Sequence, residues 1–146
     1  MPVRLRQEIQ TLLRTEGMRK DLVMTNKEVV LKFYEEVFNG WDLTHLDDFM
    51  RDDYMQHNVG VADGKEGFKE FAAKFLAAKP HMEIKKIFEN EDHVAVFFKC
   101  TMGSNGSVNK VVDIYRLQDG KLAEHWDVVE HDVGGLVATS GRDLFD

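Results

Sequence analysis

The apolar pattern of this 146-residue chain changes its period at Pro80. Before Pro80, apolar residues recur every three or four positions, as in an amphipathic helix. After it come four segments typical of strands, separated by short polar turns: MEIKKIFE, HVAVFFKCTM, VNKVVDIYRL and KLAEHWDVVEHD. Helices followed by a run of strands predict an α+β fold, in which helices pack on one face of an antiparallel sheet.

The helices of the domain are expected in three places. The sequence TNKE is a capping box, in which Thr25 caps a helix and Glu28 reaches back to it, and Gly40 can end this helix. A short helix is expected at LTHLDDFM, and a third over residues 68–76, before Pro80. The segment DDYMQHNVGVADG is expected to be a polar connection.

The first 24 residues are predicted to be a helical extension of the domain. Leu5, Ile9 and Leu12 repeat at helical spacing, and Gly17 is placed to end that helix. The capping box then begins a new helix, so the domain proper is expected over residues 25–132. Residues 133–146 form a tail with no clear period.

The composition excludes several classes of protein. Hydrophobic residues make up 43% of the chain and charged residues 31%, as in a globular domain. The net charge is −7 and no block of Lys and Arg stands out, which argues against nucleic-acid and membrane partners. We find no signal peptide and no membrane span. The single cysteine, Cys100, cannot form an internal disulfide, and we expect a cytoplasmic location.

The hairpin DIYRLQDGKLAEHWD determines which side chains share a face of the sheet. A two-residue turn at Asp119-Gly120 would place Asp113 opposite Trp126. A three-residue loop, residues 118–120, would instead place Asp113 opposite His125. We expect the three-residue loop, with Gly120 in the left-handed region. A shift of one residue would move every side chain to the other face.

This register gathers Asp113, His125 and Asp127 on one otherwise apolar face and places Trp126 on the other. A carboxylate on a covered face must be paired, hydrogen-bonded or neutral. Desolvation is also how a carboxylate becomes a base or acid near neutral pH. A buried hydrogen-bond network without chemistry would explain the same residues, and spacing does not decide between the two.

A second polar cluster, YMQHN, contains Tyr54, Gln56, His57 and Asn58, which we expect at the open end of a pocket. The sequence has no H-x-x-x-H or H-E-x-x-H pattern, so we expect no metal, although His57, Asp113 and His125 could be assembled in space. It also has no serine nucleophile elbow and no phosphate-binding loop.

Three segments, NKEVVLKFYEEVFN, DDYMQHNVGVADG and VVDIYRLQDGKLAEHWDVVE, together resemble the SnoaL-like polyketide cyclases of the nuclear-transport-factor-two-like superfamily. The resemblance covers about residues 25–132. It implies a strongly curved sheet forming a cone-shaped half-barrel with an internal cavity, and a homodimer formed through the sheet. It also implies a metal-free intramolecular aldol closure that needs no cofactor. The family often has Pro after QHN, where this chain has Val59.

Carried over from the family, Asp127 is the acid/base and Asp113 holds the partner position, where the cyclases can have His. His57 matches the QHN motif. Removing a proton next to a carbonyl needs one base and one donor to the developing oxygen, so Asp127 would take the proton and His57 or His125 would bind the oxygen. Further contacts to a small apolar carbonyl ligand are expected from Tyr34, Tyr54, Gln56, Asn58 and Tyr115.

Other functions on the same fold stay open. An isomerase would use the same groups. An epoxide hydrolase would need an Asp-Arg-Asp relay, and Arg116 has the wrong parity to join Asp113 and Asp127. A non-catalytic module that binds a small ligand or another protein would keep the pocket without using a base.

Overall fold

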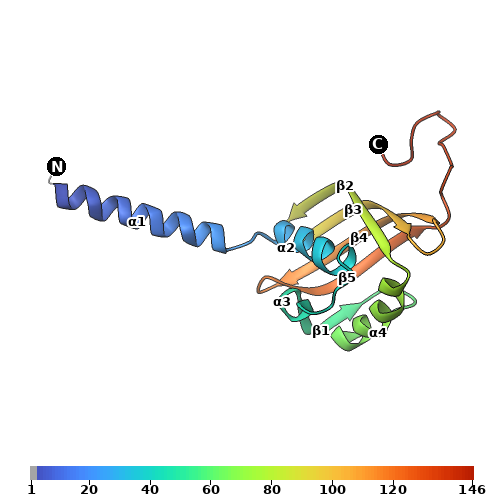
Figure 1. Ribbon diagram of the computed structural model, residues 1–146, viewed down its shortest axis with the longest axis horizontal. Helices are drawn as coiled ribbons and strands as arrows, with labels where there is room; N and C mark the ends of the chain where they lie inside the picture. Colours follow the sequence, from blue (N-terminus) through green and yellow to red (C-terminus); the bar gives the residue numbers. More distant parts are fainter. Residues whose placement is uncertain (1–2) are drawn as a thin grey trace.

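The computed structural model describes residues 3–146, and for residues 13–22 only the backbone. The elements are shown in Figure 1 and follow in chain order: α1 Val3–Leu22, α2 Asn26–Phe33, the π-helical segment η1 Tyr34–Phe38, α3 Leu46–Phe49, β1 Met50–Gln56, α4 Gly64–Ala77, β2 Pro80–Asn90, β3 His93–Met102, β4 Val108–Gln118 and β5 Lys121–Glu130.

The strands form one five-stranded sheet in the order β1-β5-β4-β3-β2. The four predicted strands, β2 to β5, pair antiparallel in chain order, whereas β1 pairs parallel with β5, so the sheet is mixed. The expectation that β1 would be a polar connection was wrong. This strand lies at the sheet edge and buries only Met50 and Tyr54, so its sequence lacks an alternating apolar pattern.

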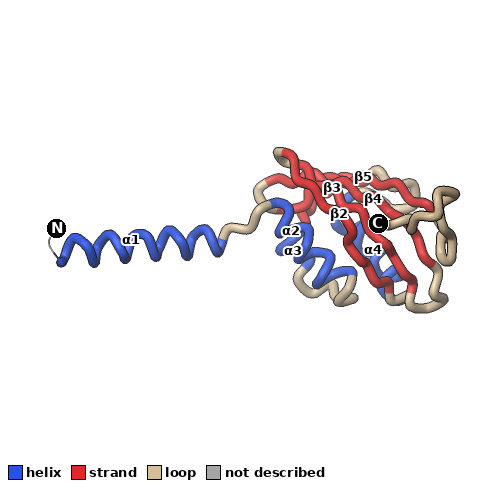
Figure 2. The backbone as a smooth tube through the Cα atoms, turned by 90° about the horizontal axis from the view of Figure 1, so that it is seen from above, coloured by secondary structure: helices blue, strands red, loops and turns tan. Residues whose placement is uncertain are grey.

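The domain helices pack on one side of the curved sheet, which does not close into a barrel (Figure 2). The predicted capping box is present: the Thr25 hydroxyl accepts from the Glu28 amide at 3.2 Å, and the Glu28 carboxylate accepts from the Thr25 amide at 3.0 Å. Gly40 lies just beyond η1, where a Cβ would stand 2.2 Å from the carbonyl oxygen of Glu36. The fold is therefore α+β, with the core between the helices and the sheet.

The extension α1 runs through Gly17 to Leu22 and projects away from the domain (Figure 1). The prediction that Gly17 ends this helix was wrong, because one interior glycine costs a helix only about 1 kcal/mol. The side chains of Leu5, Ile9 and Leu12 are exposed. No helix formed by residues 3–146 is both long and apolar enough to cross a membrane.

The hairpin between β4 and β5 differs from the predicted one in its turn. Gln118 pairs with Lys121, so the turn has two residues, and both Asp119 and Gly120 have positive φ angles of 53° and 74°. This is the favoured geometry of a tight hairpin, because its twist matches that of the strands.

A bulge in β5 then shifts the pairing of the two strands by one more residue, which returns the side chains of β5 to the predicted faces of the sheet. Leu117 pairs with Leu122, but Arg116 pairs with Glu124, which leaves Ala123 as one extra residue. As a result Asp113 lies opposite Asp127 rather than His125, which lies opposite Tyr115, and Ile114 lies opposite Trp126. The predicted cross-strand partners were wrong, yet Asp113, His125 and Asp127 do lie on one face of the sheet. Leu122, the last residue before the bulge, is fully buried in the core.

The tail folds back onto the outer face of β3. Phe145 is 7% exposed, and its ring lies 6.1 Å from that of Phe97, an outward-facing residue of β3. The ammonium of Lys99 lies 5.5 Å from the centre of the Phe145 ring. Part of the outer sheet face is therefore covered by the chain itself.

Candidate functional site

A cavity of about 210 Å³ lies between the helices and the concave face of the sheet. Its walls are mostly apolar and aromatic, with side chains from η1, α4, β2 and β3: Phe38, Phe68, Phe71, Phe75, Met82 and Phe98. The sequence pattern marked the phenylalanines of α4 as a helical apolar stripe but did not distinguish a cavity wall from a closed core. Tyr54, Gln56, Asn58 and Tyr115 form a polar end together with the titratable groups of β4 and β5.

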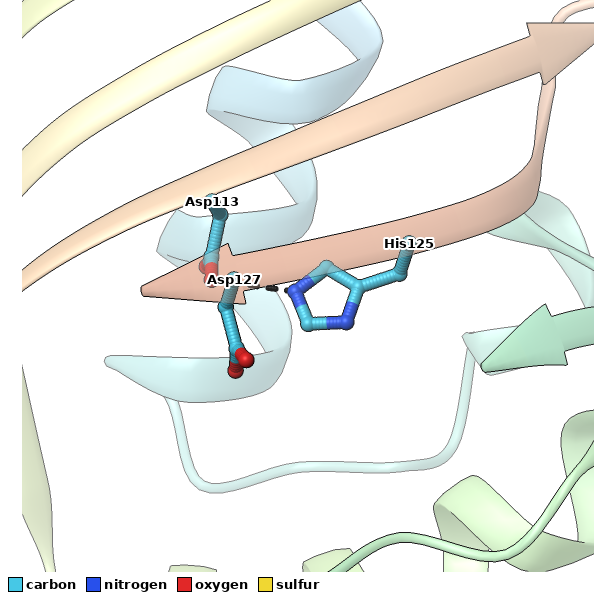
Figure 3. Close-up of side chains that lie close together, drawn as sticks. All are labelled: Asp113, His125 and Asp127. Carbon is cyan, nitrogen blue, oxygen red and sulfur yellow. Dashed lines mark hydrogen bonds and ion pairs between the residues drawn. The ribbon is translucent and has the colours of Figure 1, made fainter. Parts of the chain in front are cut away.

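At this polar end, Asp113 from β4 and His125 and Asp127 from β5 point toward one another (Figure 3). The Nε2 atom of His125 lies 3.0 Å from Oδ1 of Asp113. Both residues are buried, with exposed fractions of 7% and 5%, whereas Asp127 is half-buried and borders the cavity.

Two tyrosines hold the other carboxylate oxygen of Asp113. The hydroxyls of Tyr34 and Tyr115 both donate to Oδ2, the latter at 3.1 Å. Burial, and then the negative charge of Asp113, raise the pKa of both phenols well above 10.0, so they remain donors at neutral pH. Together with His125, three donors surround this carboxylate. Tyr34 holds Asp113 and is not among the residues that line the cavity, so its contact with a ligand stays a prediction.

The end of β1 fixes the other side of His125. Oε1 of Gln56 lies 2.6 Å from Nδ1 of His125 and accepts the backbone N–H of Asn58 at 3.0 Å. The backbone N–H of Gln56 donates to Asp63 at 2.8 Å, which anchors this turn. Tyr54, two residues earlier on the same face of β1, stacks beside His125 with ring centres 6.5 Å apart. Burial first, then Asp113 and Asp127, raise the pKa of Tyr54 well above 10.0.

Asp127 has fewer partners than Asp113. The side-chain amide of Asn58 donates to its Oδ2 at 2.6 Å, and within residues 3–146 this is the only hydrogen bond to its carboxylate. The side-chain Oδ1 of Asn58 accepts from the backbone N–H of Gly60 at 2.8 Å, which fixes the direction of the side-chain amide. The remaining lone pairs of Asp127 are free to act on a molecule in the cavity.

His57 is not among the residues that line the cavity, so the structure does not bring it together with the other predicted site residues. Its Nε2 is 2.8 Å from Glu124, and its ring stacks on Trp126 with centres 4.9 Å apart. In β1 Gln56 faces the pocket, so the next side chain points to the opposite face. Arg116 is on that outer face too, where it donates to Glu124 at 2.9 Å, so no Asp-Arg-Asp relay forms with Asp113 and Asp127.

The ligand atoms of Asp113, His125 and Asp127 lie within 4.8 Å of one another, a spacing compatible with a metal ion. Metal ligation by His125 would need a free ring nitrogen, yet both nitrogens are already hydrogen-bonded, to Gln56 and to Asp113. An ion would have to break these bonds, so we assign no metal to this cluster.

The protein belongs to a class of small α+β proteins that contain a pocket. Their helices lie on one side of an open curved sheet, and polar residues gather at one end of an apolar cavity. Solved structures of this class superpose on the chain. Wild-type IdmH, a putative polyketide cyclase from Streptomyces antibioticus, is 21% identical with a TM-score of 0.61, covering 73% of this chain and 93% of that one. A putative polyketide cyclase from Acidithiobacillus ferrooxidans is 19% identical with a TM-score of 0.64, covering 74% and 90%.

An NTF2-like protein of unknown function from Cytophaga hutchinsonii is 18% identical with a TM-score of 0.61, covering 76% of this chain and 93% of that one. No curated protein sequence matches the chain. The model of the SnoaL-like polyketide cyclases matches residues 28–132, and the chain belongs to this family.

Proposed function

We propose that the protein is an enzyme that performs metal-free and cofactor-free acid/base chemistry, an aldol-type cyclisation or an isomerisation, on a small apolar carbonyl compound. One observation carries this proposal. The carboxylate of Asp127 borders an apolar cavity and has, among residues 3–146, one hydrogen-bond partner, and it lies beside a buried His125–Asp113 pair. An open carboxylate in apolar surroundings is suited to act as a general base.

In the proposed reaction, Asp127 takes a proton from the carbon next to the carbonyl group. The electron pair of the broken C–H bond moves toward the carbonyl oxygen, which becomes an enolate. For a cyclisation, the enolate carbon attacks a second carbonyl of the same molecule, and Asp127 returns its proton to the new alkoxide. For an isomerisation, Asp127 returns the proton to another carbon. Neither route needs an added oxidant or reductant.

The enolate oxygen needs a hydrogen-bond donor. Because His57 lies outside the cavity, another residue has to supply this hydrogen bond. Tyr54 lines the cavity, and its raised pKa keeps the phenol protonated. Its oxygen accepts a hydrogen bond from Gln56, so its own proton is available to a ligand. We therefore propose Tyr54 as the donor to the developing oxygen. A preorganised donor of this kind typically contributes about 10²–10³-fold in rate.

The size of the cavity limits the proposed substrate. Its volume of about 210 Å³ is below the roughly 300–1,000 Å³ of pockets for drug-sized ligands. Away from the polar end, the walls are mostly phenylalanine, with Asn109 and His131 as further polar lining residues. The substrate class that fits is a small, largely apolar ketone or diketone with its carbonyl group directed at Tyr54 and Asp127.

The proposed setting of the enzyme is the cytoplasm, and its proposed partners are the ligand and a second copy of the chain. Cys100 is buried, and burial raises the pKa of its thiol to about 11, which keeps it unreactive. The second copy would cover the outer face of the sheet, where Ile114 and Val128 are 38% and 73% exposed.

The test compares Asp127→Asn with Glu130→Gln, a matched loss of one carboxylate at an exposed position of the same strand. A panel of small cyclic ketones and diketones is screened for binding by calorimetry and for turnover. We expect Asp127→Asn to lower kcat by about 10²–10⁴-fold and to leave binding nearly unchanged, while Glu130→Gln has the parent rate. Parent-like turnover by Asp127→Asn would reject Asp127 as the base. Binding without any turnover by the parent protein would favour a ligand-binding module.

A further inference from the structure

The orientation of the Gln56 amide fixes one proton of His125. The atom assigned as Oε1 lies 3.0 Å from the backbone nitrogen of Asn58 and 3.1 Å from that of His57. Backbone N–H groups only donate, so this atom must be the amide oxygen and not the nitrogen. The same oxygen lies 2.6 Å from Nδ1 of His125. An oxygen acceptor requires a donor, so Nδ1 carries a proton.

The other ring nitrogen faces Asp113. Nε2 lies 3.0 Å from Oδ1, and a hydrogen bond there needs a proton between the two atoms. The phenols of Tyr34 and Tyr115 both donate to Oδ2 of the same carboxylate. Hydrogen bonds of this kind favour the charged form of a carboxylate, so the shared proton rests on Nε2 rather than on Asp113. Both ring nitrogens then carry protons.

We propose that Gln56 is a positioning residue that holds His125 as a doubly protonated imidazolium paired with Asp113. The ring then has no lone pair with which to accept a proton. Of the His125, Asp113 and Asp127 cluster, this leaves Asp127 with a basic lone pair open to the cavity, while His131 lines the cavity beyond the end of β5. Assigning the base to Asp127 rests on the proposed function, whereas the protonation of His125 does not.

The groups that face the His125 ring indicate what its positive charge would do. From β1 these are Tyr54 and Gln56, from β4 Asp113 and Tyr115, and from β5 Asp127. Asp113 and Asp127 have oxygens that approach each other within 4.8 Å, and two negative charges at this distance repel each other. A cation within the same distance of both attracts each of them. Gln56 thus acts through His125 to place a positive charge beside Asp127, the proposed base.

The test is nitrogen NMR of the full-length protein labelled with ¹⁵N-histidine, at neutral pH. Ring nitrogens with and without a proton give well-separated signals, and His125→Asn identifies the signals of this ring by their loss. We expect both nitrogens of His125 to be protonated in the parent protein. His57→Ala is the control, because this ring lies outside the cavity and its loss leaves the His125 signals in place.

Two variants at Gln56 separate positioning from folding. Gln56→Leu removes the acceptor and is expected to cause loss of the Nδ1 proton, whereas Gln56→Glu keeps an acceptor and is expected to retain both protons. An unprotonated nitrogen on His125 in the parent, or two protons in a folded Gln56→Leu variant, would overturn the proposal. If Gln56→Leu does not fold, the parent and Gln56→Glu spectra decide it. These results do not depend on turnover, so they are distinct from a failure of Asp127→Asn to change the rate.

Discussion

The buried tyrosines make a specific prediction for the stability of the protein in alkali. The chain has three tyrosines, Tyr34, Tyr54 and Tyr115, and each is at most 2% exposed. Burial is the main cause that raises the pKa of each one above its ordinary value of 10.0. In the unfolded chain the same phenols would ionise near pH 10.

The sign of the effect follows from proton binding. Above pH 10 the folded protein keeps protons that the unfolded chain releases, so the free energy of unfolding falls as the pH rises. Each tyrosine lowers it by about 1.4 kcal/mol per pH unit, and the three together by about 4 kcal/mol at pH 11. The thiol of Cys100, with its pKa raised to about 11, acts in the same direction. A domain of this size has a stability of about 5–15 kcal/mol, so we expect unfolding at roughly pH 11–12.

The assay follows phenolate absorbance and far-ultraviolet circular dichroism in one alkaline titration. We expect both signals to change together, because no tyrosine ionises before the fold is lost. Tyr54→Phe is the internal check. Urea unfolding at pH 8 and at pH 11 gives the loss of unfolding free energy between the two, and removing one of three tyrosines should reduce the tyrosine part of that loss by about a third. Phenolate absorbance that appears near pH 10 with native circular dichroism would refute the reasoning.

Two further predictions concern the buried carboxylate and the outer face. Tyr34→Phe should lower the free energy of unfolding by about 1.5–3 kcal/mol, because it removes a hydrogen bond to the charged Asp113 carboxylate. When urea unfolding is measured in an Asp113→Asn background, the same substitution should cost less. Equal costs in the two backgrounds would show that the two residues are not coupled. By sedimentation at micromolar concentration the protein should be a dimer, and Val128→Glu on the outer face should dissociate it while Val59→Glu, in an exposed loop, does not. A monomeric parent protein would contradict the dimer.

Local patterns were enough to predict most elements of the fold. The capping box at Thr25 and the alternating segments after Pro80 are signals contained in a few consecutive residues, and the structure has helices and strands there. The strand β1 gave no such signal. It is formed by pairing with β5, far along the chain, and its exposed residues, Asp52, Asp53 and Met55, do not alternate with its buried ones in an apolar–polar pattern. A strand defined by its partner is not visible in its own sequence.

The sequence predicted the positions of some candidate site residues, and two errors in the predicted hairpin cancelled each other. Asp113, His125 and Asp127 were placed on one face from a loop that is one residue too long, and the bulge at Ala123 restored the parity that the shorter turn would have lost. His57 was misplaced because β1 was not recognised as a strand. Once Gln56 is known to face inward, alternation alone sends the next side chain outward.

The bulge also makes the length of β5 variable at one point. Leu117 and Arg116 are consecutive in β4, yet their partners are Leu122 and Glu124, so Ala123 is an extra residue opposite β4. Deleting Ala123 would therefore join two pairs that are already in register. Trp126 would stay on the outer face and Asp127 would stay at the cavity, and only the local distortion of the strand would be lost. A relative whose β5 is one residue shorter at this point should keep the same side chains in the cavity on a regular ladder.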